Sequence, residues 1–112
     1  MNSLGLSIGE LNLIRDVFLK NSAIVKAVVF GSRVKGNYKK YSDIDIALFD
    51  DGSHLNVERI LHELDELPLI YKFDVVAYGA VKNLALREHI DRVGVTVFER
   101  APAFGPNRAE VQ

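Results

Sequence analysis

The sequence contains no cysteine, which excludes disulfide bonds and metal sites with thiolate ligands. It also has no apolar run close to the roughly 20 residues that a membrane-spanning helix needs. The first ten residues lack the basic-then-apolar order of a secretory signal peptide. We therefore expect a protein of the cytoplasm that makes no use of a membrane.

An excess of charge of either sign is also missing. Fourteen Lys and Arg residues stand against 15 Asp and Glu residues, so the formal net charge is −1 and does not favour general nucleic-acid coating. Any affinity for phosphate must come from local clusters. With 112 residues, 48% of them hydrophobic, the chain can bury one modest core. We expect a single domain over residues 1–100 and a loosely ordered tail over residues 101–112.

Hydrophobic periodicity predicts alternating helices and strands. The first helix is opened by a capping box, Ser-x-x-Glu, that begins at Ser7. The expected elements are a helix over 8–21, strands over 24–30, 42–49 and 69–78, a helix between a possible N-cap at Ser53 and Pro68, a helix over 80–93, and an edge strand over 95–98. This order indicates an α/β (α+β) fold in which helices flank a small mixed β-sheet.

Acidic residues interrupt two of the expected strands. Asp43 and Asp45 are two residues apart, so both side chains leave one face of a strand, with Cβ atoms roughly 6 to 7 Å apart. Asp74 lies inside the next apolar run. If those strands are neighbours, three carboxylates converge, and such a set suits one or two Mg²⁺ ions. Taken alone, the acids equally fit a turn cap at Asp43, a solvent-facing edge at Asp45 and a pair between Asp74 and Lys72 or another base.

A glycine-serine turn precedes the acids. Gly31 and Ser32 directly follow an apolar strand. Glycine permits close backbone approach, exposed N–H groups bind anions, and a serine hydroxyl can donate to a phosphate oxygen. Arg33 and Lys35 add cations that either neutralise phosphate or face solvent. The turn alone is a weak signal and is not a Walker A loop. The histidines, which lack metal-ligand spacing, are expected at the surface or its boundary: His54, His62 and His89.

Together these motifs resemble the DNA polymerase β-like nucleotidyltransferases, whose signature is a Gly-Ser turn, an Asp-x-Asp strand and a third carboxylate on a later strand. Within that superfamily the chain is similar to the minimal nucleotidyltransferase (MNT) proteins, small domains commonly encoded beside HEPN-domain partners in bacteria and archaea. The resemblance covers residues 7–98. Its most telling stretches are Gly31–Gly36, Tyr41–Ala47 and Phe73–Val76.

The resemblance implies roles for individual residues. Asp43 and Asp45 would bind one or both of two Mg²⁺ ions, while Asp74 would bind the catalytic metal or accept the proton of the acceptor hydroxyl. Gly31 and Ser32 would bind the β- and γ-phosphates of ATP. The full nucleotide-binding set expected from this resemblance is Gly31, Ser32, Arg33 and Lys35.

The resemblance also implies a partner protein. Larger members of the superfamily add a domain that holds the acceptor, and 112 residues leave no room for one. MNT proteins act as antitoxins that bind a HEPN toxin, a ribonuclease, and transfer AMP from ATP to one of its tyrosines. We expect this activity here, in a homo- or hetero-oligomer. Two alternatives stay open: a non-catalytic module that neutralises its partner by occlusion, and an enzyme acting on a small molecule or an RNA end.

Overall fold

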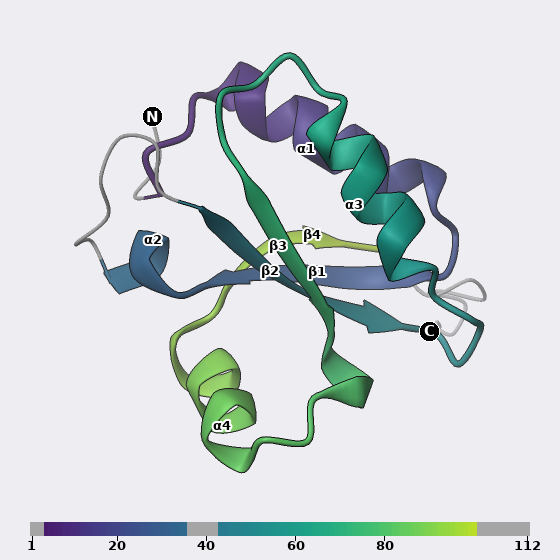
Figure 1. The fold of residues 1–112 in the computed structure, drawn as a ribbon, viewed down its shortest axis with the longest axis vertical. Helices are drawn as coiled ribbons and strands as arrows, with labels where there is room; N and C mark the ends of the chain where they lie inside the picture. Colours follow the sequence, from purple (N-terminus) through teal and green to yellow (C-terminus); the bar gives the residue numbers. More distant parts are fainter. Residues whose placement is uncertain (1–3, 36–42, 101–112) are drawn as a thin grey trace, which may run out of the picture.

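The computed structural model describes residues 4–35 and 43–100, which form a four-stranded sheet with helices on both faces (Figure 1). The elements, in chain order, are α1 (Ile8–Lys20), β1 (Ile24–Phe30), α2 (Ser32–Lys35), β2 (Ile44–Asp50), α3 (Val57–Asp65), β3 (Phe73–Ala77), the 3₁₀ turn η1 (Tyr78–Ala80), α4 (Leu84–Val93) and β4 (Val95–Glu99). The tail predicted over residues 101–112 lies outside the described residues.

The sheet is mixed, as the sequence predicts. Its strand order is β3-β2-β1-β4, in which β1 is antiparallel to both β2 and β4. β2 and β3 are parallel, and α3 supplies the crossover that a parallel connection requires. The expected fold class, a small mixed sheet flanked by helices, is confirmed.

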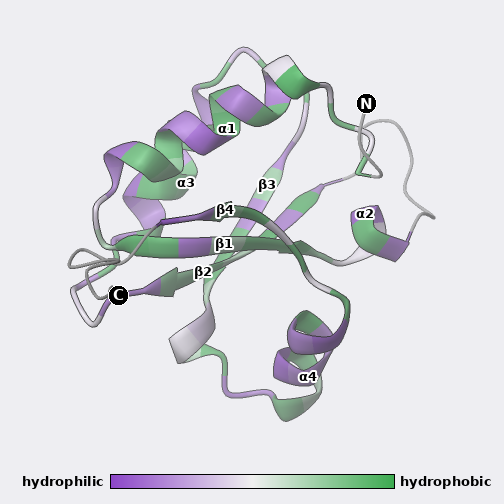
Figure 2. Cartoon of the chain, turned by 180° about the vertical axis from the view of Figure 1, so that it is seen from behind, coloured by the Kyte–Doolittle hydropathy of each residue, from purple (hydrophilic) through white to green (hydrophobic). Residues whose placement is uncertain are grey.

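Two clusters of buried side chains hold the layers together. On one face, α1 and α3 cover the side of β2 that carries Ile44, Ile46 and Leu48. On the other face, α4 brings Ile90 against Ala47, which is fully buried. The sequence indicated that this second face of β2 carries Asp43, Asp45 and Ala47 outside the core, but α4 covers the part at Ala47. Figure 2 shows hydrophilic and hydrophobic residues on each of the three longer helices, as this arrangement requires.

Capping explains where the helices begin. At α1 the Glu10 N–H donates to the Ser7 hydroxyl at 3.1 Å, and the Ser7 N–H donates to the Glu10 carboxylate at 2.9 Å. The capping box predicted from sequence is therefore confirmed. α3 begins later than expected, because its N-cap is Asn56 and not Ser53. α4 also begins late, after the N-cap Asn83, since Asn is a strong capping residue.

The strands and one helix also differ from expectation. β3 is shorter than the expected run, and β2 begins at Ile44, so Asp43 lies just before the strand. The short helix α2 was not predicted at all, because four residues show no periodicity. No helix within residues 4–35 and 43–100 is long and apolar enough to cross a bilayer.

The close packing of α4 on the sheet makes Gly94 a test of the fold. A Cβ at Gly94 would overlap the Val28 side chain and the carbonyl oxygen of Ile90. Because that oxygen is backbone and cannot turn aside, we expect Gly94→Ala to lower the free energy of unfolding by about 1–3 kcal/mol, measured by urea denaturation. The control is Gly79→Ala, where no atom lies within 4 Å and we expect a change within about 0.5 kcal/mol. Equal losses in both variants would contradict close packing at Gly94.

Candidate active site

Two of the predicted acids lie side by side at one end of the sheet. The parallel register pairs Asp45 on β2 with Asp74 on β3, and the antiparallel register pairs Asp45 with Phe30 on β1. Adjacent strands are about 4.8 Å apart, and side chains alternate between faces. Asp45 therefore shares the α4 side of the sheet with Asp74, opposite Ile44 and its core neighbours. Asp74 and the nearby Asp43 are exposed, so this end of the sheet is open to solvent.

The acids influence one another electrostatically. Partial burial raises the pKa of Asp45 above its ordinary value, and the negative charges of Asp74 and Asp43 raise it further. Within the described residues, no basic side chain forms an ion pair with Asp74, which argues against the structural alternative of a pair with Lys72. The repulsion among these carboxylates is the kind that a bound cation relieves.

The glycine-serine turn lies directly against this acidic cluster. Gly31 has a φ of 82°, a conformation that only glycine adopts readily. A Cβ built on Gly31 would overlap the Oδ2 atom of Asp45, so the carboxylate packs on the glycine Cα. Ser32 follows half-buried, and Lys35 is exposed at the end of α2. The structure therefore brings the two predicted parts of the site, the turn and the acids, into contact.

Arg33 points elsewhere. Its side chain is 1% exposed, its Nη1 donates to the Leu4 carbonyl at 3.0 Å, and its guanidinium lies 4.8 Å from the centre of the Tyr71 ring. The sequence left open whether Arg33 meets phosphate or solvent, and the structure corrects both expectations by placing it in the interior. We therefore leave its side chain out of the proposed nucleotide contacts, while Lys35 stays a candidate.

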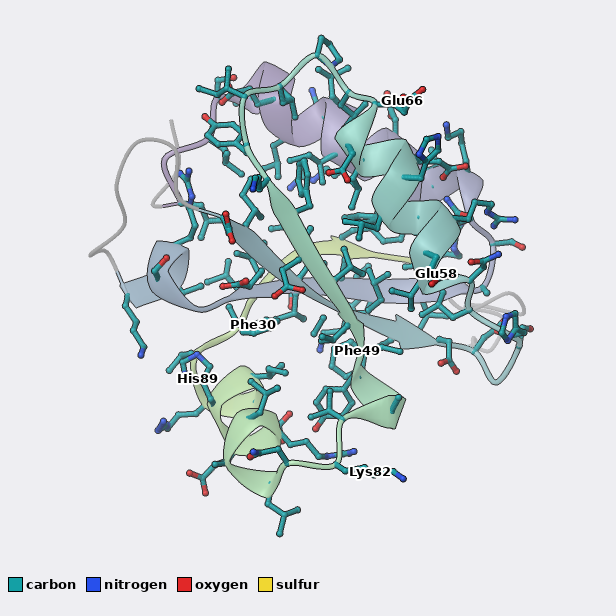
Figure 3. All side chains as sticks on the ribbon, in the orientation of Figure 1. Phe30, Phe49, Glu58, Glu66, Lys82 and His89 are labelled. Carbon is teal, nitrogen blue, oxygen red and sulfur yellow. The ribbon has the colours of Figure 1, made fainter. Side chains whose placement is uncertain are left out.

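His89 reaches the turn from α4, which the sequence did not indicate. Its Nε2 accepts a hydrogen bond from the Gly31 N–H at 3.4 Å. Phe30 meets the imidazole edge-on, with ring centroids 6.2 Å apart (Figure 3). A signal was present in the helical spacing, because His89 stands three residues after Leu86 and next to Ile90, both on the side of α4 that packs on the sheet.

The described residues contain no group of three or more His, Asp or Glu side chains already arranged to hold a metal ion. The acids gather at one end of the sheet without forming a ready set of ligands. Their chemistry still fits Mg²⁺, because carboxylate oxygens are the protein ligands that this ion prefers. Burial raises the pKa of Asp45, and the charges of Asp74 and Asp43 raise it further, so Asp45 lies within the electrostatic influence of both acids.

The raised pKa of Asp45 predicts a pH-dependent stability. A carboxyl whose pKa is higher in the folded state disfavours folding once it ionises, so its cost is absent at low pH and complete above the folded pKa. We expect Asp45→Asn to unfold at higher urea concentration than the wild type at pH 7 in a chelating buffer. The difference between the two urea midpoints should narrow as the pH falls toward the ordinary Asp pKa of about 3.9.

The control for this experiment is Asp16→Asn, which removes an exposed acid from α1. It reports how much of the change in urea midpoint comes from removing any negative charge. A difference between Asp45→Asn and the wild type that does not change with pH would contradict the electrostatic destabilisation by Asp45.

The contact between Gly31 and Asp45 predicts a selective effect of a methyl group. Gly31→Ala and Gly52→Ala both place alanine at a positive φ, and each should lower the free energy of unfolding by about 1–2 kcal/mol. Only Gly31→Ala should also displace the Asp45 carboxylate, since Gly52 has no atom within 4 Å of its Cβ position. The ¹³C chemical shift of the Asp45 carboxyl measures this. An unchanged shift in Gly31→Ala would contradict the contact.

Comparison with known proteins places this geometry in a family. The sequence matches the family described as "Polymerase beta, Nucleotidyltransferase" over residues 12–103. A curated relative from Haemophilus influenzae, named "Probable protein adenylyltransferase MntA", is 32% identical over 98 residues, covering 76% of this chain and 85% of the relative. These matches confirm the resemblance predicted from the motifs.

Solved structures share the fold. A crystal structure of a toxin–antitoxin with AMP-PNP matches with a TM-score of 0.67 and 22% identity, over 80% of this chain and 73% of that chain. A mutant of the toxin–antitoxin MntA–HpeT matches with a TM-score of 0.65 and 18% identity, over 80% of this chain and 72% of that one. At these identities the matches support the fold, whereas the sequence matches establish the family. The chain belongs to the polymerase β nucleotidyltransferase family and is a nucleotidyltransferase homologous to MntA.

Proposed function

We propose that this protein is a cytoplasmic, Mg²⁺-dependent antitoxin that transfers AMP from ATP to a tyrosine of a HEPN toxin. The observation that carries the proposal is the contact between a candidate phosphate-binding turn and a pair of acids. Gly31 of the Gly31-Ser32 turn touches Asp45, and the strand register sets Asp74 beside Asp45. Nucleotidyl transfer needs these two functions, phosphate binding and metal binding, next to each other.

The residues of the site divide between metal binding and phosphate binding in the proposed reaction. Asp43, Asp45 and Asp74 would hold Mg²⁺, which when bound neutralises phosphate charge and aligns the groups that react. Gly31 lets the turn lie against the Asp45 carboxylate, and the Ser32 hydroxyl of the same turn would donate to a phosphate oxygen. Such positioning and charge stabilisation supply most of the rate in phosphoryl chemistry.

The proposed reaction exchanges one bond at the α-phosphorus for another. The tyrosine oxygen forms a bond to the α-phosphorus, and the bond from that phosphorus to the bridging oxygen breaks, so that pyrophosphate leaves. Asp74 would accept the proton of the tyrosine hydroxyl, and its exposure on the edge strand β3 supports this role. Asp45 lies deeper, so its part is metal binding.

The open side of the site supports a protein acceptor. Asp43 and Asp74 are exposed, and the described part of the chain has no second layer over them. The relative from Haemophilus influenzae carries the name of a protein adenylyltransferase, and the fold matches a toxin–antitoxin crystallised with AMP-PNP. An acceptor supplied by another protein would cover the open side in the complex.

Replacement of the acids tests the proposed transfer. We expect the wild type, incubated with ATP, Mg²⁺ and the product of the neighbouring gene, to add one AMP to that partner, measured by intact mass and by mapping of the modified tyrosine. Asp45→Asn and Asp74→Asn should each reduce the rate by at least about 100-fold, because each loses a metal ligand or a proton acceptor. The control Asp16→Asn, on α1, should transfer at the wild-type rate.

The other outcomes identify the alternatives. If the wild type transfers nothing yet protects cells from the partner, and Asp45→Asn protects equally well, the protein neutralises its partner by occlusion. If AMP passes to a small molecule or an RNA end without any partner protein, the acceptor class proposed above is wrong. Transfer that continues undiminished in Asp45→Asn and Asp74→Asn would overturn the active site itself.

A further inference from the structure

The interior contact between Arg33 and Tyr71 joins the two segments that carry the candidate site. Arg33 directly follows Ser32 of the proposed phosphate-binding turn. Tyr71 stands three residues before Asp74 and leads into β3. The guanidinium lies 4.8 Å from the centre of the Tyr71 ring, which is within the range of a cation–π contact. One contact therefore connects the phosphate side of the site with its third carboxylate.

The orientation of α2, the helix that carries Arg33, depends on contacts with the rest of the protein. α2 has four residues, and the Val34 and Lys35 N–H groups donate to the Gly31 carbonyl at 3.2 Å each. A helix this short is not stable by itself, because forming the first turn costs more than its few hydrogen bonds return. The direction in which the turn presents Ser32 must therefore be set by contacts from outside α2. Arg33 makes two of these, to the Tyr71 ring and to the Leu4 carbonyl.

Tyr71 is itself fixed to the body of the protein. Its hydroxyl lies 3.3 and 3.2 Å from the two carboxylate oxygens of Glu10, the residue that completes the capping box of α1. The following carbonyl, of Lys72, accepts the Ile44 N–H at 2.8 Å where β2 begins. α1, the start of β2 and the start of β3 are thus connected at the Tyr71 segment, and Arg33 adds α2 to that connection.

The Arg33–Tyr71 pair lies on the face of the sheet opposite to the acids. Tyr71 packs against the core cluster that also contains Phe73, on the α1 and α3 side. Asp74, with the opposite parity along the strand, faces the other way. The pair can therefore set the position of the site without touching substrate. Burying a guanidinium is costly, and this cost favours a role for Arg33 beyond filling space in the core.

We propose that Arg33 and Tyr71 are positioning residues that fix the Gly31-Ser32 turn relative to Asp74, so that a nucleotide triphosphate finds its phosphate and metal sites already aligned. This inference rests on the proposed nucleotidyl transfer. A loose turn would weaken nucleotide binding and slow the reaction, because geometry that is not held in advance must be ordered at the moment of binding.

Arg100 provides a matched control elsewhere in the molecule. Its guanidinium lies 5.3 Å from the centre of the Phe98 ring and donates to the carbonyls of Ile24 and Phe18 at 3.0 and 3.1 Å. It thus makes the same two kinds of contact as Arg33. It follows β4 at the end of the sheet where β1 begins, whereas the acids lie where β1 ends. Arg100→Met should therefore cost stability without disturbing the site.

The test compares Arg33→Met with Arg100→Met in the full chain. We expect both to lower the melting temperature, but only Arg33→Met to weaken binding of a non-hydrolysable ATP analogue with Mg²⁺, by about 10-fold or more. Hydrogen exchange of the amides in residues 31–35 should become faster in folded Arg33→Met and stay unchanged in Arg100→Met. The exchange measurement does not depend on nucleotide.

Variants of Tyr71 distinguish the effect of its ring from that of its hydroxyl. They also test the inference if Arg33→Met does not fold. Tyr71→Phe keeps the ring over Arg33 and should stay within about 3-fold of wild-type affinity, whereas Tyr71→Leu should behave like Arg33→Met. Wild-type affinity in Arg33→Met or Tyr71→Leu, or equal losses in Arg33→Met and Arg100→Met, would overturn the inference. A wild type that binds no nucleotide would instead refute the proposed function, and the exchange rates would still decide whether the pair holds the turn.

Discussion

The register between β2 and β3 is the constraint on which the candidate site depends. Side chains alternate along a strand, so a slip of one residue would move Asp74 to the opposite face and separate it from Asp45. The core prevents that slip, because the same register sets Ile44 beside Phe73 and Ile46 beside Val75 on the face covered by α1 and α3. Apolar packing on one face therefore holds two carboxylates together on the other, although they repel each other.

Under the proposed function, this arrangement gives up some stability to bring the acids and the turn together. Burial, together with the charges of Asp74 and Asp43, raises the pKa of Asp45. Gly31 keeps a backbone conformation that few residues tolerate, and the Asp45 carboxylate packs on its Cα. Natural proteins break local rules of this kind mainly where a site requires it. The surrounding elements obey the rules closely: α1 carries a complete capping box, and β1 and β2 are almost wholly apolar on the faces they bury. The exceptions thus gather at the open end of the sheet.

Local chemistry made much of this predictable from the sequence. The bounds of β1 and the capping box at Ser7 depend on residues close in the chain, and the structure agrees with both. The strand face that we expected Asp43 to share with Asp45 does not include Asp43, because β2 begins at Ile44. The direction of Arg33 and the contact of His89 with Gly31 could not be predicted in the same way. Arg33 meets Leu4, 29 residues away, and His89 meets Gly31, 58 residues away. A side chain in a four-residue helix has no periodicity to reveal its burial, so only the tertiary structure decides it.

The acids alone do not form a ready metal site, and this bears on how a metal would bind under the proposed function. Across the described ranges 4–35 and 43–100, no three acidic or histidine side chains form a ready set of ligands, while Asp45 feels the charge of both neighbours. Mg²⁺ demands near-octahedral oxygen ligands and in such sites takes several of them from substrate phosphates and water. A triphosphate on the Gly31-Ser32 turn would therefore complete a ligand set that the acids begin. In that case the alignment of the turn with the acids, held from the other face of the sheet by Arg33 and Tyr71, governs metal and nucleotide binding together.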